Sequence, residues 1–200
     1  MNRPELNVAG LPTVVFGRRS LTWWGIIGLM AIEGTMFAIL IASYFFYHTR
    51  SSSWPPGLMP PALIYGCLNT AVFLISLVPN FWMHQIAPSG DLRKVRVGLS
   101  VMTVFGIINI VLRVFEFPAL NCQWDANAYA SVVWTLLGLH SIHLATDWYD
   151  TVVLLVLMFR DPLIEGRRFV DVEENAYYWY FVVFAWLPIW FTLYIAPRLF

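Results

Sequence analysis

Charge is scarce in this sequence: Asp, Glu, Lys and Arg together make up 12% of its 200 residues, whereas 59% are hydrophobic. The formal net charge is zero, and no basic tract is longer than two residues. The lack of basic tracts argues against nucleic acid as a partner. So apolar a composition lies outside the range of soluble globular domains. The sequence therefore indicates a polytopic membrane protein.

Motifs of several catalytic classes are missing as well. The only cysteines, Cys67 and Cys122, form neither a metal-type pair nor a disulfide framework. We find no nucleophile motif, no glycine-rich phosphate loop and no axial-histidine pattern of a haem-copper core. The first twenty residues lack the apolar core of a cleavable signal. We therefore expect an accessory membrane subunit with no catalytic residue and no metal site of its own.

Apolar residues gather in five stretches, each long enough to cross a hydrocarbon core ~30 Å thick as a helix. They cover approximately residues 21–47, 61–83, 95–112, 128–159 and 176–195. A soluble fold of this length could not bury five such segments. The prediction is an all-α membrane protein that forms a single domain over residues 1–200, with a short cytoplasmic segment at residues 1–20.

Basic residues divide unevenly between the two sides of the predicted bundle. Nine of the twelve fall on one side: Arg3, Arg18, Arg19, Arg93, Lys94, Arg96, Arg160, Arg167 and Arg168. The positive-inside rule assigns that side, with the N-terminus, to the cytoplasm. Because the number of spans is odd, the C-terminus is expected outside.

Glu33 lies near the middle of the first predicted span. Insertion scales put an acidic residue at the centre of a membrane helix at roughly 2.5–3.5 kcal/mol, so such a residue is expected to have a partner or a function. Gly34, Ala38 and Ala42 recur every four residues beside it. A stripe of small residues lets another helix approach closely, so we expect the turn that carries Glu33 to pack against a neighbour.

The fourth predicted span carries four ionisable residues, His140, His143, Asp147 and Asp150, within about 80° of one helix face. Such a stripe suits a buried interhelical network, a proton relay or a metal site. No second Glu-x-x-His helix accompanies it, which disfavours a metal. We favour the buried network, and we expect it to include three further residues from other spans: Asn69, Arg113 and Glu116.

Several segments occur together in the order found in one family of membrane subunits. They are IEGTMF with Glu33, WPPGLMPP followed by Leu68-Asn69-Thr70 and His84, LRVFEF with Glu116, HSIH at residues 140–143, and ENAYYWYFVVFAW near the C-terminus. Through these segments the chain, from about Arg19 onward, resembles subunit III of the haem-copper cytochrome oxidases.

The resemblance implies a subunit without redox centres that packs on the catalytic subunit I, in a complex with subunit II. It implies bound phospholipid in a cleft and support for proton uptake and for durability of the active site, with haem and copper in the partner subunits. Glu33 would be the buried carboxylate of the lipid-cleft helix, and Glu116, His140 and His143 the polar core of the other helices. Larger members have seven helices, and this chain would be the five-helix form that lacks the first two.

The function that we expect is therefore subunit III of an oxygen-reducing, proton-pumping terminal oxidase in the inner membrane of a bacterium. One alternative is an accessory protein of nitric oxide reductase, which shares the five-helix form. Another is an independent proton-coupled transporter, although the sequence lacks the internal repeat and broken helices typical of that class.

The sequence also departs from the family pattern. Arg113 stands where the family usually has Gln, and Tyr180 and Val183 stand where it has His and Asp. Asp147 and Asp150 are additions to the HSIH helix. We hypothesise that charge lost from the fifth span is replaced by charge from the third and fourth spans.

Overall fold

A computed structural model describes residues 21–160 and 167–199 of the chain, and within these ranges it contains helices and loops but no strand. The long helices are α1 (Leu21–His48), α2 (Leu63–Ile86), α3 (Leu92–Glu116), α4 (Ala128–Arg160) and α5 (Arg167–Trp190). The described ranges hold five helices long and apolar enough to cross a membrane. This confirms the predicted all-α, five-span fold class. The predicted segment 1–20, with Arg3, Arg18 and Arg19, lies outside the described residues.

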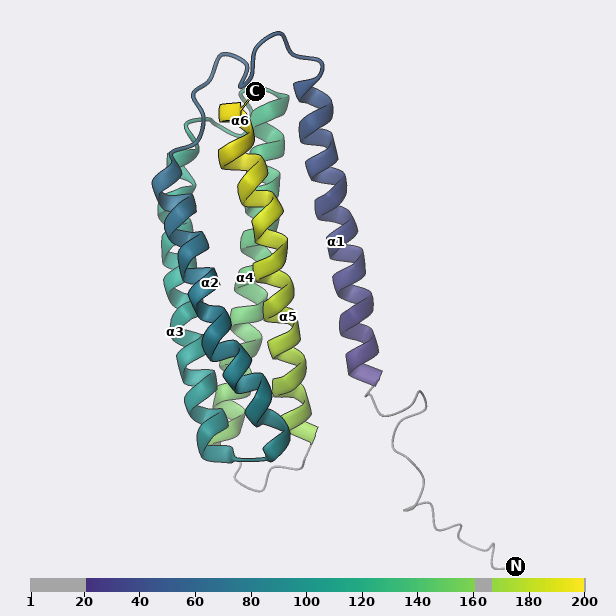
Figure 1. Cartoon of the computed structure of the whole chain (residues 1–200), viewed down its shortest axis with the longest axis vertical. Helices are drawn as coiled ribbons and strands as arrows, with labels where there is room; N and C mark the ends of the chain where they lie inside the picture. Colours follow the sequence, from purple (N-terminus) through teal and green to yellow (C-terminus); the bar gives the residue numbers. More distant parts are fainter. Residues whose placement is uncertain (1–20, 161–166, 200) are drawn as a thin grey trace, which may run out of the picture.

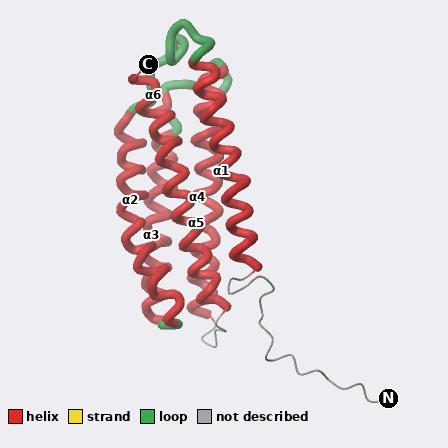
Figure 2. The backbone as a smooth tube through the Cα atoms, turned by 45° about the vertical axis from the view of Figure 1, so that its right-hand side comes forward, coloured by secondary structure: helices red, strands yellow, loops and turns green. Residues whose placement is uncertain are grey.

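The helices run up and down between two ends of an elongated bundle (Figure 1). We call one end the loop end, because residues 49–62 and 117–127 cover it (Figure 2). The other end, where α1 and α5 begin, we call the groove end. The start of α1 and the C-terminal helix α6 (Ala196–Leu199) lie at opposite ends (Figure 1).

Helices α2 to α5 form the main bundle, and α1 lies beside it against α4 and α5 (Figure 1). The centre of the bundle is lined by fully buried side chains of α5, among them Val183, Trp186 and Ile189. In contrast, only 6% of the most apolar stretch of α1 is buried, against 50% of that in the last span. Most of the α1 surface is therefore free to face lipid or another chain.

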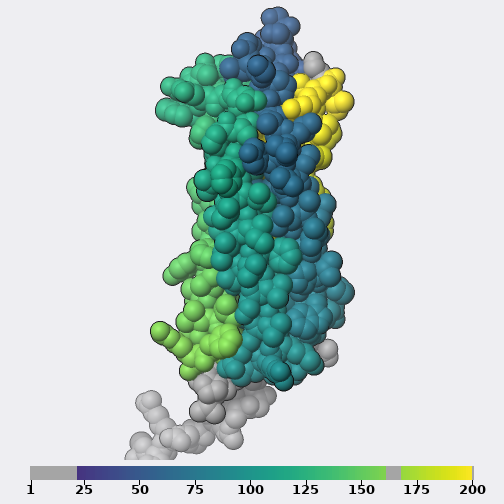
Figure 3. Space-filling view, turned by 90° about the vertical axis from the view of Figure 1, so that its left-hand side faces the viewer, coloured from purple at the N-terminus to yellow at the C-terminus, as the bar shows by residue number. Residues whose placement is uncertain are grey.

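Along the opposite face, α2 and α3 lie in contact along their length (Figure 3). A short turn joins them at the groove end, where Gly90 adopts a φ of 68° in the left-handed region that glycine enters without steric cost. Asp91 then caps α3, because its side chain accepts a hydrogen bond from the backbone N–H of Lys94 at 3.2 Å. The Lys94 ammonium and this N–H hold the pKa of Asp91 below its ordinary value.

The loop rich in proline, residues 49–62, cannot form a helix and instead packs on the loop end. Asn121 donates a hydrogen bond to the carbonyl of Pro60 at 2.9 Å, and Asn127 donates one to that of Pro56 at 3.3 Å. Asn127 also caps α4 through the backbone N–H of Ala130. Two asparagines of the loop 117–127 thus fasten the first long loop to the segment that leads into α4.

The contact between α3 and α4 depends on a glycine. A Cβ on Gly106 would lie 2.4 Å from Cδ1 of Trp148, whose indole N–H donates to the carbonyl of Thr103 at 3.2 Å. We expect Gly106→Ala to push this indole away and to cost about 1–3 kcal/mol of stability. Thermal unfolding of the purified protein in detergent measures the loss. Gly138→Ala is the control, because nothing lies within 4 Å of its Cβ position; equal melting temperatures for the two variants would contradict the prediction.

Candidate functional site

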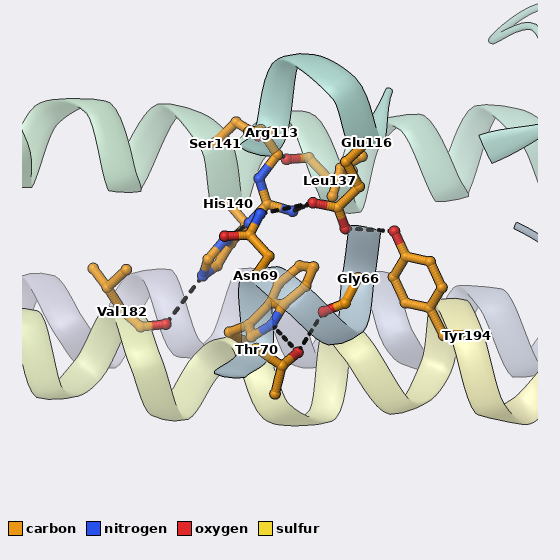
Figure 4. A network of polar contacts seen from close by, with 11 residues as sticks. Gly66, Asn69, Thr70, Arg113, Glu116, Leu137, His140, Ser141, Val182 and Tyr194 are labelled. Carbon is orange, nitrogen blue, oxygen red and sulfur yellow. Dashed lines mark hydrogen bonds and ion pairs between the residues drawn. The ribbon is translucent and has the colours of Figure 1, made fainter. Parts of the chain in front are cut away.

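The polar residues predicted from the sequence fall into two separate groups along α4. The first, which we call the ion-pair network, consists of Asn69, Arg113, Glu116, His140 and Tyr194 (Figure 4). It lies in the half of the bundle nearer the loop end and joins α2, α3, α4 and the π-helical segment Phe191–Ile195. All five of its members are buried.

Glu116 is the acceptor at the centre of this network. Its Oε2 accepts hydrogen bonds from Nη1 of Arg113 at 2.7 Å and from Nδ2 of Asn69 at 2.8 Å. Its Oε1 accepts one from the hydroxyl of Tyr194. The side chain of Glu116 is 0% exposed and that of Arg113 is 4% exposed. Both charges are therefore out of water and depend on each other and on these neutral donors.

Arg113 connects the same pair to α4 and α5. Its Nη2 lies 3.1 Å from Nδ1 of His140, and its guanidinium stacks over the Trp186 ring with Cζ 4.2 Å from the centroid. Nε2 of His140 lies 3.0 Å from the carbonyl oxygen of Val182. A carbonyl only accepts and a guanidinium only donates, so His140 carries its proton on Nε2 and accepts on Nδ1.

A glycine on α2 makes room for this arrangement. A Cβ on Gly66 would lie 2.6 Å from the ring of Tyr194. The missing side chain lets that ring pack against α2 while its hydroxyl reaches Glu116 (Figure 4). One turn on, Thr70 donates to the Gly66 carbonyl at 2.7 Å and accepts from the indole of Trp186 at 2.8 Å.

The second group, which we call the groove network, consists of Glu33, His143, Asp147, Asn175 and Tyr178. Oε1 of Glu33 lies 3.1 Å from Nε2 of His143, and its Oε2 accepts from the hydroxyl of Tyr178 at 2.8 Å. Nδ1 of His143 lies 2.6 Å from a backbone carbonyl, that of Leu139, and must donate to it. One proton is therefore shared between Nε2 of His143 and the Glu33 carboxyl.

Asp147 completes the groove network one turn further along α4. Its Oδ1 accepts from Nδ2 of Asn175 at 3.1 Å, and Oδ1 of Asn175 in turn accepts from Thr151 at 3.1 Å. The residue is 1% exposed, yet its Oδ2 has no hydrogen-bond partner within the described part of the chain. Buried carboxylate oxygens are normally satisfied, so this atom marks a place for a bound proton or water.

The groove network opens onto a cavity of about 510 Å³ between α1, α4 and α5. It reaches from Thr22 and Asp171, at the groove end, to Glu33 and Tyr178 near the middle of the bundle. We call this cavity the acidic groove, because five of its lining residues are carboxylic acids: Glu33, Asp147, Asp150, Asp171 and Glu174.

Next to it, toward the loop end, lies an apolar slot of about 470 Å³ between α1 and α5. Its walls are Gly34, Phe37, Ala38, Ile41 and Ala42 of α1 and Phe181, Ala185 and Pro188 of α5. The stripe of small residues thus faces another helix, as expected. The two helices are close at Gly34, where a Cβ would lie 3.7 Å from Cε2 of Phe181, and the slot lies between them along the stripe.

The prediction that Asp150 belongs to a buried network is wrong. Asp150 is exposed and has no hydrogen bond or ion pair in the part of the chain that the structure describes. Ten residues beyond His140, it is turned about 80° away from that histidine around α4, so it lies on the open side of the acidic groove. Of the three acidic or basic residues that depart from the family pattern, Arg113 and Asp147 are the two that lie in the interior.

Sequence reasoning missed several members of both networks. Asn175 and Tyr178 are three residues apart and therefore share a face of α5, a spacing that could have marked them as a polar pair. Tyr194, and Trp186 that packs on Arg113 beside the ion-pair network, gave no such signal, because aromatic residues are abundant throughout the chain. Their roles follow from which buried partner their one polar atom reaches.

A family model described as "Cytochrome c oxidase subunit III" matches residues 11–197. The chain belongs to this family. The family resemblance seen in the sequence motifs is thereby confirmed.

Three curated relatives, each named cytochrome c oxidase subunit 3, illustrate the similarity. The protein of Osphranter robustus is 25% identical over 175 residues, which cover 83% of this chain and 67% of the relative. That of Drosophila melanogaster is 27% identical over 180 residues, which cover 86% of this chain and 68% of the relative. That of Oryctolagus cuniculus is 26% identical over 158 residues, which cover 74% of this chain and 60% of the relative. The matches thus span about two thirds of the length of these subunit 3 proteins.

His140 and His143 are not placed to bind haem iron or copper in this subunit III chain. Both ring nitrogens of His140 are engaged, by Arg113 and by Val182. Both of His143 are engaged as well, by Leu139 and by Glu33. A ligand needs a free imidazole nitrogen, so these residues serve hydrogen bonding within the chain.

The ion-pair network predicts a specific pattern of stability. Glu116→Gln leaves Arg113 buried without its counter-charge, and we expect a loss of about 3–5 kcal/mol. Combining it with Arg113→Gln removes both charges while keeping polar groups, so the double variant should regain much of that loss. Thermal unfolding of single and double variants in detergent measures the coupling. A double variant as unstable as the sum of the two singles would contradict the prediction.

Proposed function

We propose that this chain is the non-catalytic subunit III of an oxygen-reducing, proton-pumping haem-copper oxidase. In this proposal it packs on subunit I, beside subunit II, binds phospholipid, and supports proton uptake and the durability of the catalytic site. The observation that carries the proposal is the family match over residues 11–197 in a chain with five helices able to span a membrane. Haem and copper would lie in the partner subunits.

The apolar slot supports the lipid-binding part of the proposal. Its lining residues are all apolar, and it lies between a peripheral helix and the main bundle, where an acyl chain can enter from the side. The slot would shelter part of such a chain from the surrounding bilayer. Phe37 and Phe181 offer aromatic walls on either side of it.

The distribution of charge supports an orientation. Six of the nine basic residues in the described ranges belong to the groove end: Arg93, Lys94, Arg96, Arg160, Arg167 and Arg168. We therefore propose that the groove end faces the cytoplasm and the C-terminus faces outward. The cell membrane of a bacterium, in which the same rule applies, is the location that we propose.

Affinity purification of the chain from its native membrane in mild detergent tests the assignment. We expect haem and copper in fixed ratio to the tagged chain, together with two larger membrane subunits. Non-haem iron in place of copper would instead favour a nitric oxide reductase. A chain that purifies alone, stable and free of haem, would contradict both and favour an independent transporter.

Replacing Glu33 tests the role of the site in such a complex. Glu33→Ala removes the acceptor for both His143 and Tyr178, while α1 keeps its contacts near the loop end. We expect the subunit to remain assembled, with lower lipid content or a several-fold shorter lifetime during turnover. Glu173→Ala is the control, because Glu173 pairs with His84 on another face of α5 at 3.7 Å. Loss of the whole subunit from the complex in Glu33→Ala alone would mark Glu33 as structural instead.

A further inference from the structure

We propose that the acidic groove is a proton-exchange half-channel: protons enter at the groove end, pass Asp147, load the Glu33–His143 pair and go no further. The proposal deepens the suggested role in proton uptake and rests on it only for the direction, from the cytoplasm. It assigns a function to Asp147 and to the acids at the mouth of the groove.

The acids of the groove are staggered along its length. Asp171 lies near the start of α5, Asp150 and Glu174 follow, Asp147 lies deeper, and Glu33 marks the far limit. They come from α1, α4 and α5, and none of the described residues that line the groove is Lys or Arg. Acids at successive depths suit the stepwise movement of protons better than they suit one bound cation.

Charged groups on every neighbouring helix can be placed relative to this path. Besides its acids, α5 carries Arg168, one turn before Asp171 at the mouth. From α2, His84 reaches Glu173 at 3.7 Å. From α3, Arg96 donates to the carbonyl of Met158 at 2.9 and 2.7 Å. Arg168 itself donates to the carbonyl of Leu157 at 3.2 Å. These bases are therefore engaged with other groups, and among the acids of the groove Glu33 is the one paired with His143.

Asp147 supplies the evidence for a transferable proton. Asp147 lines the groove, and its Oδ1 is occupied by Asn175, whereas its Oδ2 is buried without a donor from the described residues. An oxygen so deeply buried needs either a proton of its own or a water to donate to it. Either one provides the link between the outer acids and the Glu33–His143 pair.

The Glu33–His143 pair is a suitable end point because Nε2 of His143 and Oε1 of Glu33 face each other at 3.1 Å and can hold a proton between them. Nδ1 of His143 is fixed as a donor, so Nε2 and the carboxyl hold the exchangeable proton between them. Gain of a second proton gives an imidazolium beside a neutral carboxyl. Loss of the shared proton gives a neutral imidazole beside a carboxylate.

Beyond this pair the polar path stops. Phe37 is 4% exposed, and its ring centroid lies 5.1 Å from that of His143 and 6.2 Å from that of His140. The apolar slot continues along the same seam with no polar side chain in its described lining. Phe37 therefore places an apolar ring beside both histidines at the far end of the groove network, and no hydrogen bond within the described part of the chain joins the two networks.

An acid jump on the purified complex, followed by time-resolved infrared spectroscopy, tests the half-channel. We expect a protonated-carboxyl band to form in the wild type and to be absent in Glu33→Gln, which assigns it. Asp147→Asn should slow formation of this band roughly tenfold or more, because the relay group can no longer accept and release a proton. Glu173→Gln is the matched control and should leave the rate unchanged.

A second variant keeps the test decisive if Asp147→Asn fails to assemble. Leu29→Trp fills the groove without removing a carboxyl, since Leu29 lines it and is 45% exposed. It should also slow formation of the Glu33 band. Unchanged rates in the assembled variants, or no Glu33-dependent band at all, would overturn the half-channel while leaving a co-purified oxidase complex intact. Slowed rates in a chain that carries no haem or copper would keep the half-channel and reject the oxidase assignment.

Discussion

The ion pair between Arg113 and Glu116 is the interaction on which the bundle of α2 to α5 depends. Within a bilayer, apolar side chains gain little by leaving lipid for a neighbouring helix, so polar contacts and close packing must hold helices together. Here the Glu116 carboxylate accepts hydrogen bonds from residues of α2, α3 and the π-helical segment. The Arg113 guanidinium contacts residues of α4 and α5. The low dielectric that makes each charge expensive also makes their mutual attraction strong, so loss of either partner alone leaves the other charge buried without compensation.

Helix α1 is attached to this bundle in a different way. Near the loop end, Tyr44 is 1% exposed, accepts a hydrogen bond from the indole of Trp54 at 2.9 Å and packs against Tyr129. Toward the groove end its polar anchor is Glu33, held by His143 and Tyr178. Helix α1 is thus held by the aromatic packing of Tyr44 at one end and by the contacts of Glu33 near its middle. Between and beyond these two points there is room for the slot and the acidic groove. The cavities follow from this uneven attachment.

The sequence predicted the helices well because runs of apolar residues are a local signal, but it misplaced some of their ends. Helix α5 begins at Arg167, well before residue 176, since the charged turns around Glu173 continue the helix beyond its apolar part. The stripe on α4 was also visible, and Arg113, Glu116 and His140 do lie together. A helical wheel gives a direction but no distance to a partner. It could therefore not show that His143 contacts Glu33, that Phe37 packs beside both histidines, or that Asp150 has no hydrogen bond among the described residues.

The two histidines show how one helix can serve two purposes. His140 lies between a fixed donor and a fixed acceptor, so its tautomer is set and a change in its protonation would break a contact on either side. His143 has one nitrogen fixed by a carbonyl and the other directed at a carboxyl, so a proton can move between them with both contacts kept. The partners, and not the spacing of the histidines in the sequence, thus fix the tautomer of the first and bring the second against a carboxyl group. The buried ring of Phe37 packs beside both histidines.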